Sequence, residues 1–420
     1  MTRTELEEEQ LLPLVQNAPT AFLRRLKIRN YKSIGNCDVE LRPLTVLVGR
    51  NGSGKSNFLD ALRFVADALR TSLDHAIKSR GGIDEVRRRV AGHPNNFALE
   101  LEVDLGDGRW AHYGFEVAAR KKGGFSVKKE ALQIRGGLNQ LVGSYRLDEG
   151  KLTHSSETPM PPASSDRLYL VNAAGLPTFR SVYDALLTMG FYNLNPESMK
   201  ALQSPDAGEI LHRDGGNIAS VIGRIGNDRP PIKERIKEYL ATIVPGVTDV
   251  SRIPLGPKET LEFRQKVHKS PSPWKFLANS MSDGTLRALG TLVAVTQLAE
   301  GAAPVRLVGI EEPETALHPA ASGALMDALR EAAVHTQVVV TTHSPDLLDR
   351  VNPETDRLLV VEIRDGDTKV APIDAASLKV IKKQLYTPGE LLRMDQLELD
   401  WRDLERQKQI DMFEYSEPRK

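Results

Sequence analysis

The hydrophobic pattern divides the chain into two α/β segments that flank a middle region of different character. Residues 44–48 form a continuous apolar run, which is typical of a strand buried on both faces. Residues 57–73 follow with apolar side chains at helical spacing and predict an amphipathic helix. Helical and apolar patterns alternate again further along the chain, at 286–299, 305–310, 320–333 and 337–341. Strands that alternate with helices predict a mainly parallel sheet with helices on both faces.

The middle region reads first as a β-meander and then as helices. Short runs between residues 97 and 152 alternate apolar and polar side chains and are separated by glycine-rich turns, which predicts antiparallel strands. Residues 178–245 are mainly helical in pattern. We therefore expect an α/β fold that is split in sequence by an inserted antiparallel β-meander and helical lobe. The expected units are residues 1–75, 76–274, 275–375 and a helical tail at 376–420.

Composition excludes several classes of protein. The 56 Lys and Arg residues balance the 56 Asp and Glu residues, so no overall charge attracts the chain to nucleic acid or membrane. The single cysteine, Cys37, excludes an intramolecular disulfide framework and a cysteine-based zinc site. Residues 1–10 are acidic and lack the basic start of a signal peptide, and no apolar run is long enough to cross a membrane. We expect a cytoplasmic protein that has no membrane partner.

The strongest motif is a phosphate-binding loop between the predicted strand 44–48 and the helix that follows it. Residues 49–56 read Gly-Arg-Asn-Gly-Ser-Gly-Lys-Ser and fit the pattern G-x-x-x-x-G-K-[ST]. Backbone N–H groups of such a loop converge on phosphate oxygens, Lys55 reaches the β- and γ-phosphates, and Ser56 ligates Mg²⁺. The expected nucleotide-binding residues here are Gly49, Asn51, Gly52, Ser53, Gly54, Lys55, Ser56 and Asn57.

Three further segments carry polar groups suited to phosphoryl transfer. The apolar run at 305–310 ends in Glu311 and Glu312, of which one suits Mg²⁺ and the next suits polarising water. Ser282 stands at a predicted helix start that could bind an anion, and His343 follows a buried strand. Taken singly, each has a plain structural interpretation: a solvated acidic turn, a helix N-cap and a structural histidine.

In this order the motifs resemble those of the ABC-type ATPases of the SMC/RecF/OLD-like class. The resemblance rests on the P-loop, a signature at 281–285, the acidic strand end, a D-loop at 314–319 and the switch histidine His343. Residues 30–34, Asn-Tyr-Lys-Ser-Ile, look like the N-F/Y-[RK]-S element of this class and add Lys32 to the expected nucleotide-binding residues. Within the class, the chain looks most like the stand-alone AAA_21-type ATPases of bacterial anti-phage defence systems.

The resemblance implies an ABC-type P-loop ATPase head that binds ATP and Mg²⁺ in a head-to-tail dimer. Ser282 and Gly284 of one subunit would close on the γ-phosphate held by Lys55 of the second copy. The implied catalytic residues are Glu312, His343 and Lys55, and the implied metal ligands are Ser56 and Glu311. Glu311 departs from the pattern, since the class often has Asp there. A Q-loop glutamine is not identified; Gln133 and Gln140 are candidates.

Other features bear on DNA, an effector and nuclease activity. Basic residues at 120–122 and 128–129 form one cluster and those at 87–89 form another; either is a solvated face or a DNA-backbone contact. Glu362, Asp365 and Asp367 superficially resemble the carboxylates of a TOPRIM nuclease, but residues 365–367 fit a hairpin turn better. In the tail, Leu391, Met394, Leu397 and Trp401 are spaced to bury one helix face, against this chain's own head, a second copy or an effector.

The expected function is therefore ATP hydrolysis coupled to dimerisation, which senses or remodels DNA or controls a separate nuclease or toxin effector in anti-phage defence. Two alternatives remain open at this point. One is a RecF-like ATPase of DNA repair or recombination, and the other is a scaffold that binds nucleotide without hydrolysing it and holds a toxin inactive. A transporter ATPase is disfavoured, because the interval between Lys55 and Ser282 is much longer than in transporter heads.

Overall fold

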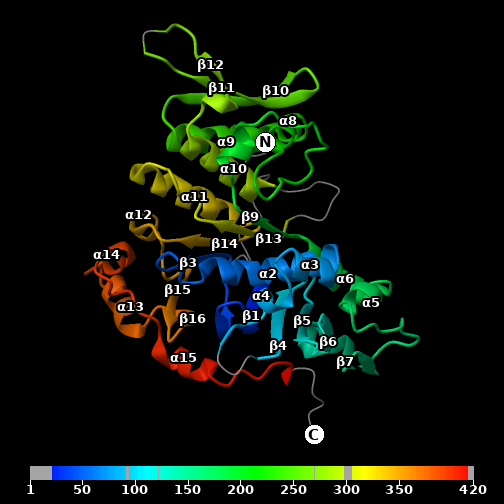
Figure 1. The fold of residues 1–420 in the computed structure, drawn as a ribbon. Helices are drawn as coiled ribbons and strands as arrows, with labels where there is room; N and C mark the ends of the chain where they lie inside the picture. Colours follow the sequence, from blue (N-terminus) through cyan, green and yellow to red (C-terminus); the bar gives the residue numbers. More distant parts are fainter. Residues whose placement is uncertain (1–20, 91–93, 122, 269, 298–304, 415–420) are drawn as a thin grey trace, which may run out of the picture.

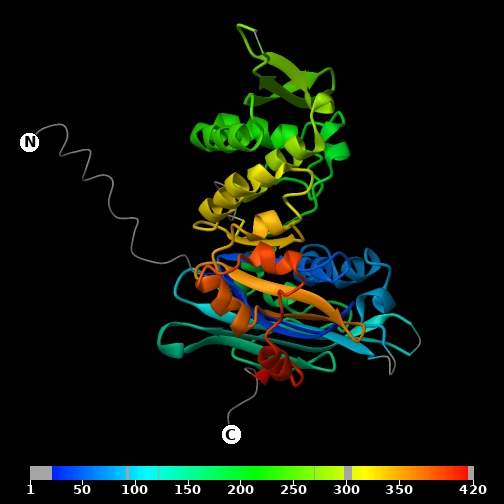
Figure 2. The ribbon, with the colours of Figure 1, turned by 90° about the vertical axis from the view of Figure 1, so that its left-hand side faces the viewer.

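The structure is a computed structural model that describes residues 21–90, 94–121, 123–268, 270–297 and 305–414. The molecule has two parts along its length. A large sheet with its helices forms the lower part of Figure 1, and a narrower lobe of helices capped by a small sheet extends away from it. The view in Figure 2 shows the same separation. Residues 1–20, which begin the expected unit 1–75, lie outside the described residues.

The head is built on one mixed sheet of 13 described strands. Strands β16–β15–β3–β14–β13–β9 form one half, in which the pairs from β15 to β9 are parallel. Strands β8 to β2 form an antiparallel half. In sheet order the strands are β8 (Lys151–Ser155), β7 (Leu141–Asp148), β6 (Phe125–Arg135), β5 (Trp110–Ala119), β4 (Asn96–Asp104), β1 (Leu23–Tyr31), β2 (Ile34–Glu40), β16 (Asp367–Pro372), β15 (Arg357–Arg364), β3 (Leu44–Val48), β14 (Gln337–Thr342), β13 (Leu307–Glu311) and β9 (Met189–Tyr192).

The β-meander is present as expected, and within the expected unit 76–274 it belongs to the head sheet rather than to the lobe. Strand β4 pairs with β1, so β4 to β8 extend the head sheet without a break. The register aligns Ile28 with Leu99 and Leu26 with Leu101, and all four side chains are buried. Shared burial of these alternating apolar side chains makes the meander part of the head.

Two hydrophobic cores lie on opposite faces of the parallel strands. In β3 all five side chains are buried; Leu47 packs with Phe58 and Leu62 of α2, whereas Val46 and Val48 pack with residues of α10 and α11. This two-sided burial explains the uninterrupted apolar run in the sequence. The helices of the first core are α2 (Lys55–Arg70), α3 (Leu73–Lys78), α4 (Ile83–Val86), α5 (Leu170–Ala173) and α6 (Pro177–Leu187), and those of the second include α10 (Asp283–Thr296), α11 (Ser322–Ala332) and α12 (Pro345–Leu348).

The lobe contains the remaining part of the second core. A three-stranded antiparallel sheet packs on α8 and α9 through Val250, Leu261 and Phe263, and this is the narrow end in Figure 1. The lobe elements are α7 (Pro196–Lys200), α8 (Ile218–Asp228), α9 (Pro230–Ile243), β10 (Val247–Leu255), β11 (Lys258–Gln265) and β12 (Trp274–Leu277). Short 3-10 helices are η1 (Gly137–Asn139), η2 (Ala278–Ser280) and η3 (Pro319–Ala321).

The tail consists of three short helices that dock on the chain's own head, α13 (Ala375–Lys382), α14 (Pro388–Arg393) and α15 (Trp401–Gln407). Leu391 and Leu397 are buried, but Met394 and Trp401 are exposed, so the predicted single amphipathic face is wrong. Beyond α15, the backbone N–H of Phe413 donates to Glu100 at 2.8 Å. The described tail therefore covers its own head. None of the described helices is long and apolar enough to cross a bilayer.

Candidate nucleotide site

The P-loop joins β3 to α2 and is shaped by its glycines. Gly52 and Gly54 have φ values of 77° and 103°, a region that side chains other than glycine rarely adopt. A Cβ at Gly54 would lie 2.2 Å from Thr368 Oγ1, and one at Gly49 would lie 2.0 Å from Val361 O. The β15–β16 hairpin thus packs against the loop, and larger residues at these positions would force the two apart.

Lys55 points back into this loop. Its Nζ donates to Gly49 O at 2.7 Å and to Arg50 O at 3.1 Å. Burial lowers the pKa of Lys55, while the nearby carboxylates Glu312 and Glu314 act in the opposite direction. The ammonium therefore lies between the phosphate-binding backbone and the carboxylates at the end of β13.

A buried hydroxyl in the same loop is also suited to an oxyanion. Ser53 is 5% exposed, and its Oγ has no hydrogen-bond partner among the described residues. A buried hydroxyl without a partner is costly, and a phosphate oxygen would satisfy it. Asn57 Nδ2 donates to Ser33 Oγ at 2.6 Å, and Thr368 Oγ1 donates to Ser53 O at 3.0 Å. Asn57 thus connects the loop to the 30–34 element and is occupied by a protein contact in this structure.

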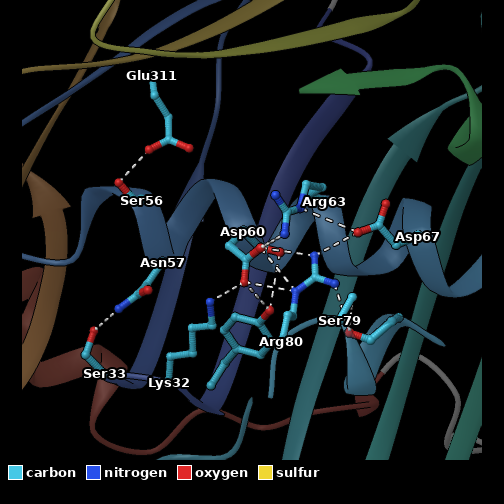
Figure 3. A network of polar contacts seen from close by, with 12 residues as sticks. Lys32, Ser33, Ser56, Asn57, Asp60, Arg63, Asp67, Ser79, Arg80 and Glu311 are labelled. Carbon is cyan, nitrogen blue, oxygen red and sulfur yellow. Dashed lines mark hydrogen bonds and ion pairs between the residues drawn. The ribbon is translucent and has the colours of Figure 1, made fainter. Parts of the chain in front are cut away.

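The parallel register brings the predicted metal ligands together. β14 pairs with both β3 and β13, so the P-loop and the end of β13 lie at one edge of the sheet. Ser56 Oγ donates to Glu311 Oε2 at 2.7 Å (Figure 3). A hydroxyl and a carboxylate fit Mg²⁺, which uses few protein ligands and completes its shell with phosphates and water. The described residues contain no cluster of three or more His, Cys, Asp or Glu that could hold a metal.

Glu312 and His343, from the ends of neighbouring strands, form a pair beside these ligands. His343 Nδ1 lies 3.1 Å from Glu312 Oε1. Glu312 has a φ of 45°, and its N–H donates to Thr341 O at 3.0 Å, which turns the chain sharply after β13. Both side chains are partly exposed. A carboxylate held by an imidazole at this position can accept a proton from an attacking water.

Glu314 is a third carboxylate, which the sequence assigned only to the D-loop. It is 8% exposed and hydrogen-bonded to Thr342, and burial raises its pKa. Its Oε2 has no hydrogen-bond partner among the described residues. Glu314 therefore lies close to Lys55 but is buried, unlike the partly exposed Glu312.

The signature is an exposed helix start. Ser282 is the N-cap of α10, and its Oγ accepts a hydrogen bond from Thr285 N at 3.2 Å. Ser282 and Asp283 are exposed, whereas Gly284 is buried. A Cβ at Gly284 would lie 2.2 Å from Ala316 O, so the D-loop packs directly on the signature. In Figure 1, α10 lies on the lobe side of β13 and β14, and α2 lies on the other side.

Lys32 is bound to a largely buried carboxylate rather than directed at the P-loop. Its Nζ lies 2.6 Å from Asp60 Oδ2 on α2, and Arg63, Arg80 and Tyr31 also contact Asp60 (Figure 3). Burial alone would raise the pKa of Asp60, but Arg80 and Lys32 lower it to about 2. Asp60 therefore remains charged and fixes the β1–β2 turn on the P-loop helix.

The structure also shows residues that the sequence did not single out. Gln133 lies on β6, far across the sheet from β3, and Gln140 lies in the loop before β7, so neither candidate is near the P-loop. Strand β9 instead ends beside Glu311: its last residue, Tyr192, pairs with Ile310, and Asn193 follows. The only sequence signal was a short apolar run next to Asn193, which a four-residue edge strand makes easy to miss. Arg213 reaches the same place from a loop, with its Nη2 3.6 Å from Glu311 Oε1.

Together, the fold and the ordered motifs fit an ABC-type P-loop ATPase head. Two family models match the two halves. The family described as "AAA ATPase domain" matches residues 22–105, and the family described as "AAA domain, putative AbiEii toxin, Type IV TA system" matches residues 258–349.

Curated relatives point to the same class. An OLD nuclease of Thermus scotoductus is 24% identical over 378 residues, which are 82% of this chain and 65% of the nuclease. The DNA replication and repair protein RecF of Streptococcus uberis is 32% identical over 93 residues, 20% of this chain and 24% of RecF. The chain thus spans less than two thirds of the length of these relatives.

Solved structures support the fold. An SMC head bound to the C-winged helix domain of ScpA covers 85% of this chain, with a TM-score of 0.51 and 17% identity; 99% of that head is matched. An SMC head with an extended coiled coil, bound to the C-terminal domain of ScpA from Pyrococcus furiosus, covers 87%, with a TM-score of 0.50, 15% identity and 99% of the head matched. In these comparisons the chain resembles the ATPase heads of the SMC/RecF/OLD-like class.

Proposed function

We propose that the protein is an ATP- and Mg²⁺-dependent ATPase that works as a head-to-tail dimer in the cytoplasm. The observation that carries this proposal is the Glu312–His343 pair beside the Ser56–Glu311 contact and Lys55. Ser56 and Glu311 would hold the metal, which draws electron density from the phosphates, and Lys55 would bind the β- and γ-phosphates. Glu312 would accept the proton of the attacking water, and His343 would hold the Glu312 carboxylate in place.

Steady-state phosphate release from purified protein tests hydrolysis. We expect turnover with Mg²⁺ and ATP, none with EDTA, and a change when duplex DNA is added. Tight nucleotide binding without turnover would instead favour the non-hydrolysing scaffold. A DNA effect that depends on gapped or single-stranded structure would favour the RecF-like alternative.

Exposure of the signature supports the composite site in a dimer. Ser282 and Asp283 face solvent at the start of a 14-residue helix, so their N–H groups are available to an anion from another subunit.

We expect a mixture of two inactive variants, Lys55→Ala and Ser282→Arg, to regain up to a quarter of wild-type ATPase activity, since roughly that share of sites would be intact after random pairing. The measurement is phosphate release from each variant alone and from the mixture. Ser280→Arg, on an exposed residue outside the signature, is the matched control. Absence of recovery in demonstrated mixed dimers would contradict the composite site.

The proposed biological role is control of a separate nuclease or toxin effector in anti-phage defence. Its support is the toxin–antitoxin description of the family matched at 258–349 and the likeness to the OLD nuclease. Within the described residues, the nuclease-like carboxylates are committed elsewhere: Glu362 pairs with Arg364, and Asp367 binds Arg88, Lys369 and the N–H of Gly35. We therefore expect the purified chain with Mg²⁺ or Mn²⁺ and ATP to leave DNA uncut.

DNA is a proposed partner through the β5–β6 hairpin. Arg87, Arg88 and Arg89 are each ion-paired to a carboxylate, which favours a structural role for that cluster. The described lysines of the hairpin are more available, since Lys128 has only a long contact of 3.7 Å to Glu149. Lys122 lies outside the described residues.

Replacing Lys121, Lys122, Lys128 and Lys129 by Glu should weaken DNA binding and flatten its salt dependence. Each phosphate contact that is lost lowers the slope of log affinity against log salt by about 0.9. The measurement is fluorescence anisotropy with duplex DNA over a salt series. Lys237→Glu and Lys382→Glu, on other surfaces, are controls for charge reversal at a single lysine. An unchanged slope would assign the hairpin to a solvated surface.

A further inference from the structure

Arg213 occupies an unexplained position beside the metal carboxylate. Its Nη2 lies 3.6 Å from Glu311 Oε1, while the other oxygen of Glu311 accepts the Ser56 hydroxyl at 2.7 Å. The Arg213 side chain is 50% exposed, so the protein does not bury it in place. Glu311 therefore already has a cationic partner on the side opposite Ser56.

The backbone holds this arginine at the end of the sheet. Asn193 N–H donates to Arg213 O, and Asn195 N–H donates to Asp214 O, both at 3.0 Å. Because β9 pairs in parallel with β13 up to Tyr192, these contacts align the Arg213 loop with the end of β13. A cleft of about 540 Å³, lined by Asn193, Leu194, Asn195, Arg213, Asp214 and Arg287, adjoins the loop and can receive a displaced side chain.

The charges around Arg213 make its position depend on whether Glu311 also holds a cation. The pKa of Arg63 is lowered first by burial and then by the neighbouring cations Arg80 and Arg213. Arg213 thus lies close to Arg63, a like charge that pairs with Asp60 and Asp67, and its own ion pair is with Glu311. A divalent cation on Glu311 would both repel the guanidinium and compete for its partner.

We propose that Arg213 is the counter-ion of Glu311 before the metal arrives, and that binding of Mg²⁺ with ATP displaces it. This inference rests on the proposed function, since it requires Mg²⁺–ATP at the P-loop. The ligand chemistry is a nucleoside triphosphate with its divalent cation. When Mg²⁺ is absent, the triphosphate keeps its full negative charge, and the Arg213 guanidinium lies close enough to the site to attract it.

Displacement of Arg213 has a physical route to the signature of the same subunit. Asn195 caps α7 by accepting a hydrogen bond from Glu197 N at 3.0 Å. At the other end of α7, Lys200 Nζ lies 2.7 Å from Asp283 Oδ1, the residue after Ser282. The Arg213 loop, α7 and the start of α10 are therefore joined by consecutive polar contacts, and movement of the loop changes the position of the signature.

The test measures binding of a fluorescent, non-hydrolysable ATP analogue to full-length protein, in EDTA and over a Mg²⁺ series. Removing the charge in Arg213→Gln should have two effects of opposite direction. Affinity for the analogue in EDTA should fall on the order of two- to fivefold. Affinity for Mg²⁺ should rise, so that the Mg²⁺ concentration for half-maximal enhancement of binding decreases by a similar factor, as expected for a partly exposed ion pair. Arg213→Lys should restore much of both effects.

Arg224→Gln is the matched control, because Arg224 is a partly exposed arginine in the same lobe that pairs with Glu209 and Asp228. It should leave both values unchanged. Hydrogen exchange supplies a second readout: Mg²⁺ and analogue should alter protection of the amides of residues 193–195 in wild type but not in Arg213→Gln.

The outcomes separate this inference from the proposed function. If wild type does not bind the analogue with Mg²⁺, the proposed function fails, and the inference fails with it. If wild type binds but Arg213→Gln shifts both affinities in the same direction, or shifts neither, the counter-ion role alone is overturned. If Arg213→Lys shows the same two shifts as Arg213→Gln, the positive charge is not their cause, and the counter-ion role is again overturned.

Discussion

Lys55→Ala should abolish detectable ATP binding. The ammonium donates to Gly49 O and Arg50 O inside the P-loop and lies near Glu312 and Glu314, so it is fixed where the β- and γ-phosphates would bind. Loss of two charge-assisted hydrogen bonds costs about 3 kcal/mol or more, which corresponds to at least about 100-fold in affinity. Isothermal titration calorimetry with Mg²⁺ and ATP measures the loss.

The control for this variant is Lys78→Ala, because Lys78 is an exposed lysine that pairs with Asp74 on α3. It should bind ATP as wild type does. Thermal unfolding of both variants should show that Lys55→Ala remains folded. Wild-type affinity in Lys55→Ala would contradict the assignment of the P-loop.

Glu312→Gln should retain ATP binding and lower turnover by about 10²- to 10⁴-fold, the usual contribution of a general base. The amide preserves the shape of the side chain and its contact with His343, but it cannot take a proton from water. Single-turnover hydrolysis measures chemistry apart from product release, and the same samples report binding by nucleotide retention.

Two neighbouring carboxylates provide the comparison. Glu311→Gln should raise the Mg²⁺ concentration that hydrolysis requires, because Glu311 contacts Ser56 at the metal position. Glu314→Gln should retain a larger share of turnover, because Glu314 is buried against Thr342 and is held away from solvent water. Near wild-type hydrolysis by Glu312→Gln would exclude Glu312 as the base and direct attention to Glu311.

The sequence predicted the parts of the head in which local pattern and chemistry coincide. The P-loop lies between β3 and α2 as expected, Glu311 ends β13 and Glu312 follows it, and residues 365–366 turn between β15 and β16. A P-loop needs glycines at fixed positions, and a strand buried on both faces needs an uninterrupted apolar run. Such requirements involve only a few consecutive residues and can therefore be recognised in the amino-acid sequence.

Relations between distant segments were not visible. Apolar alternation predicted the strands of the meander, but it does not show that β4 pairs with β1 within the head sheet. Four residues were too few to reveal β9, so Asn193 and Arg213 were missed. The tail spacing suggested one helical face, whereas turns between α13, α14 and α15 direct Met394 and Trp401 to solvent. Tertiary packing decides such cases.

The central claim is that ATP joins two copies of this head through the exposed signature. Sedimentation velocity of Glu312→Gln tests it most directly, because ATP that is bound and not hydrolysed should hold the closed state. With Mg²⁺ and ATP the variant should sediment as a dimer, and without nucleotide as a monomer, while Glu312→Gln combined with Ser282→Arg should stay monomeric in both conditions. A Glu312→Gln protein that is saturated with ATP and remains a monomer would contradict the account.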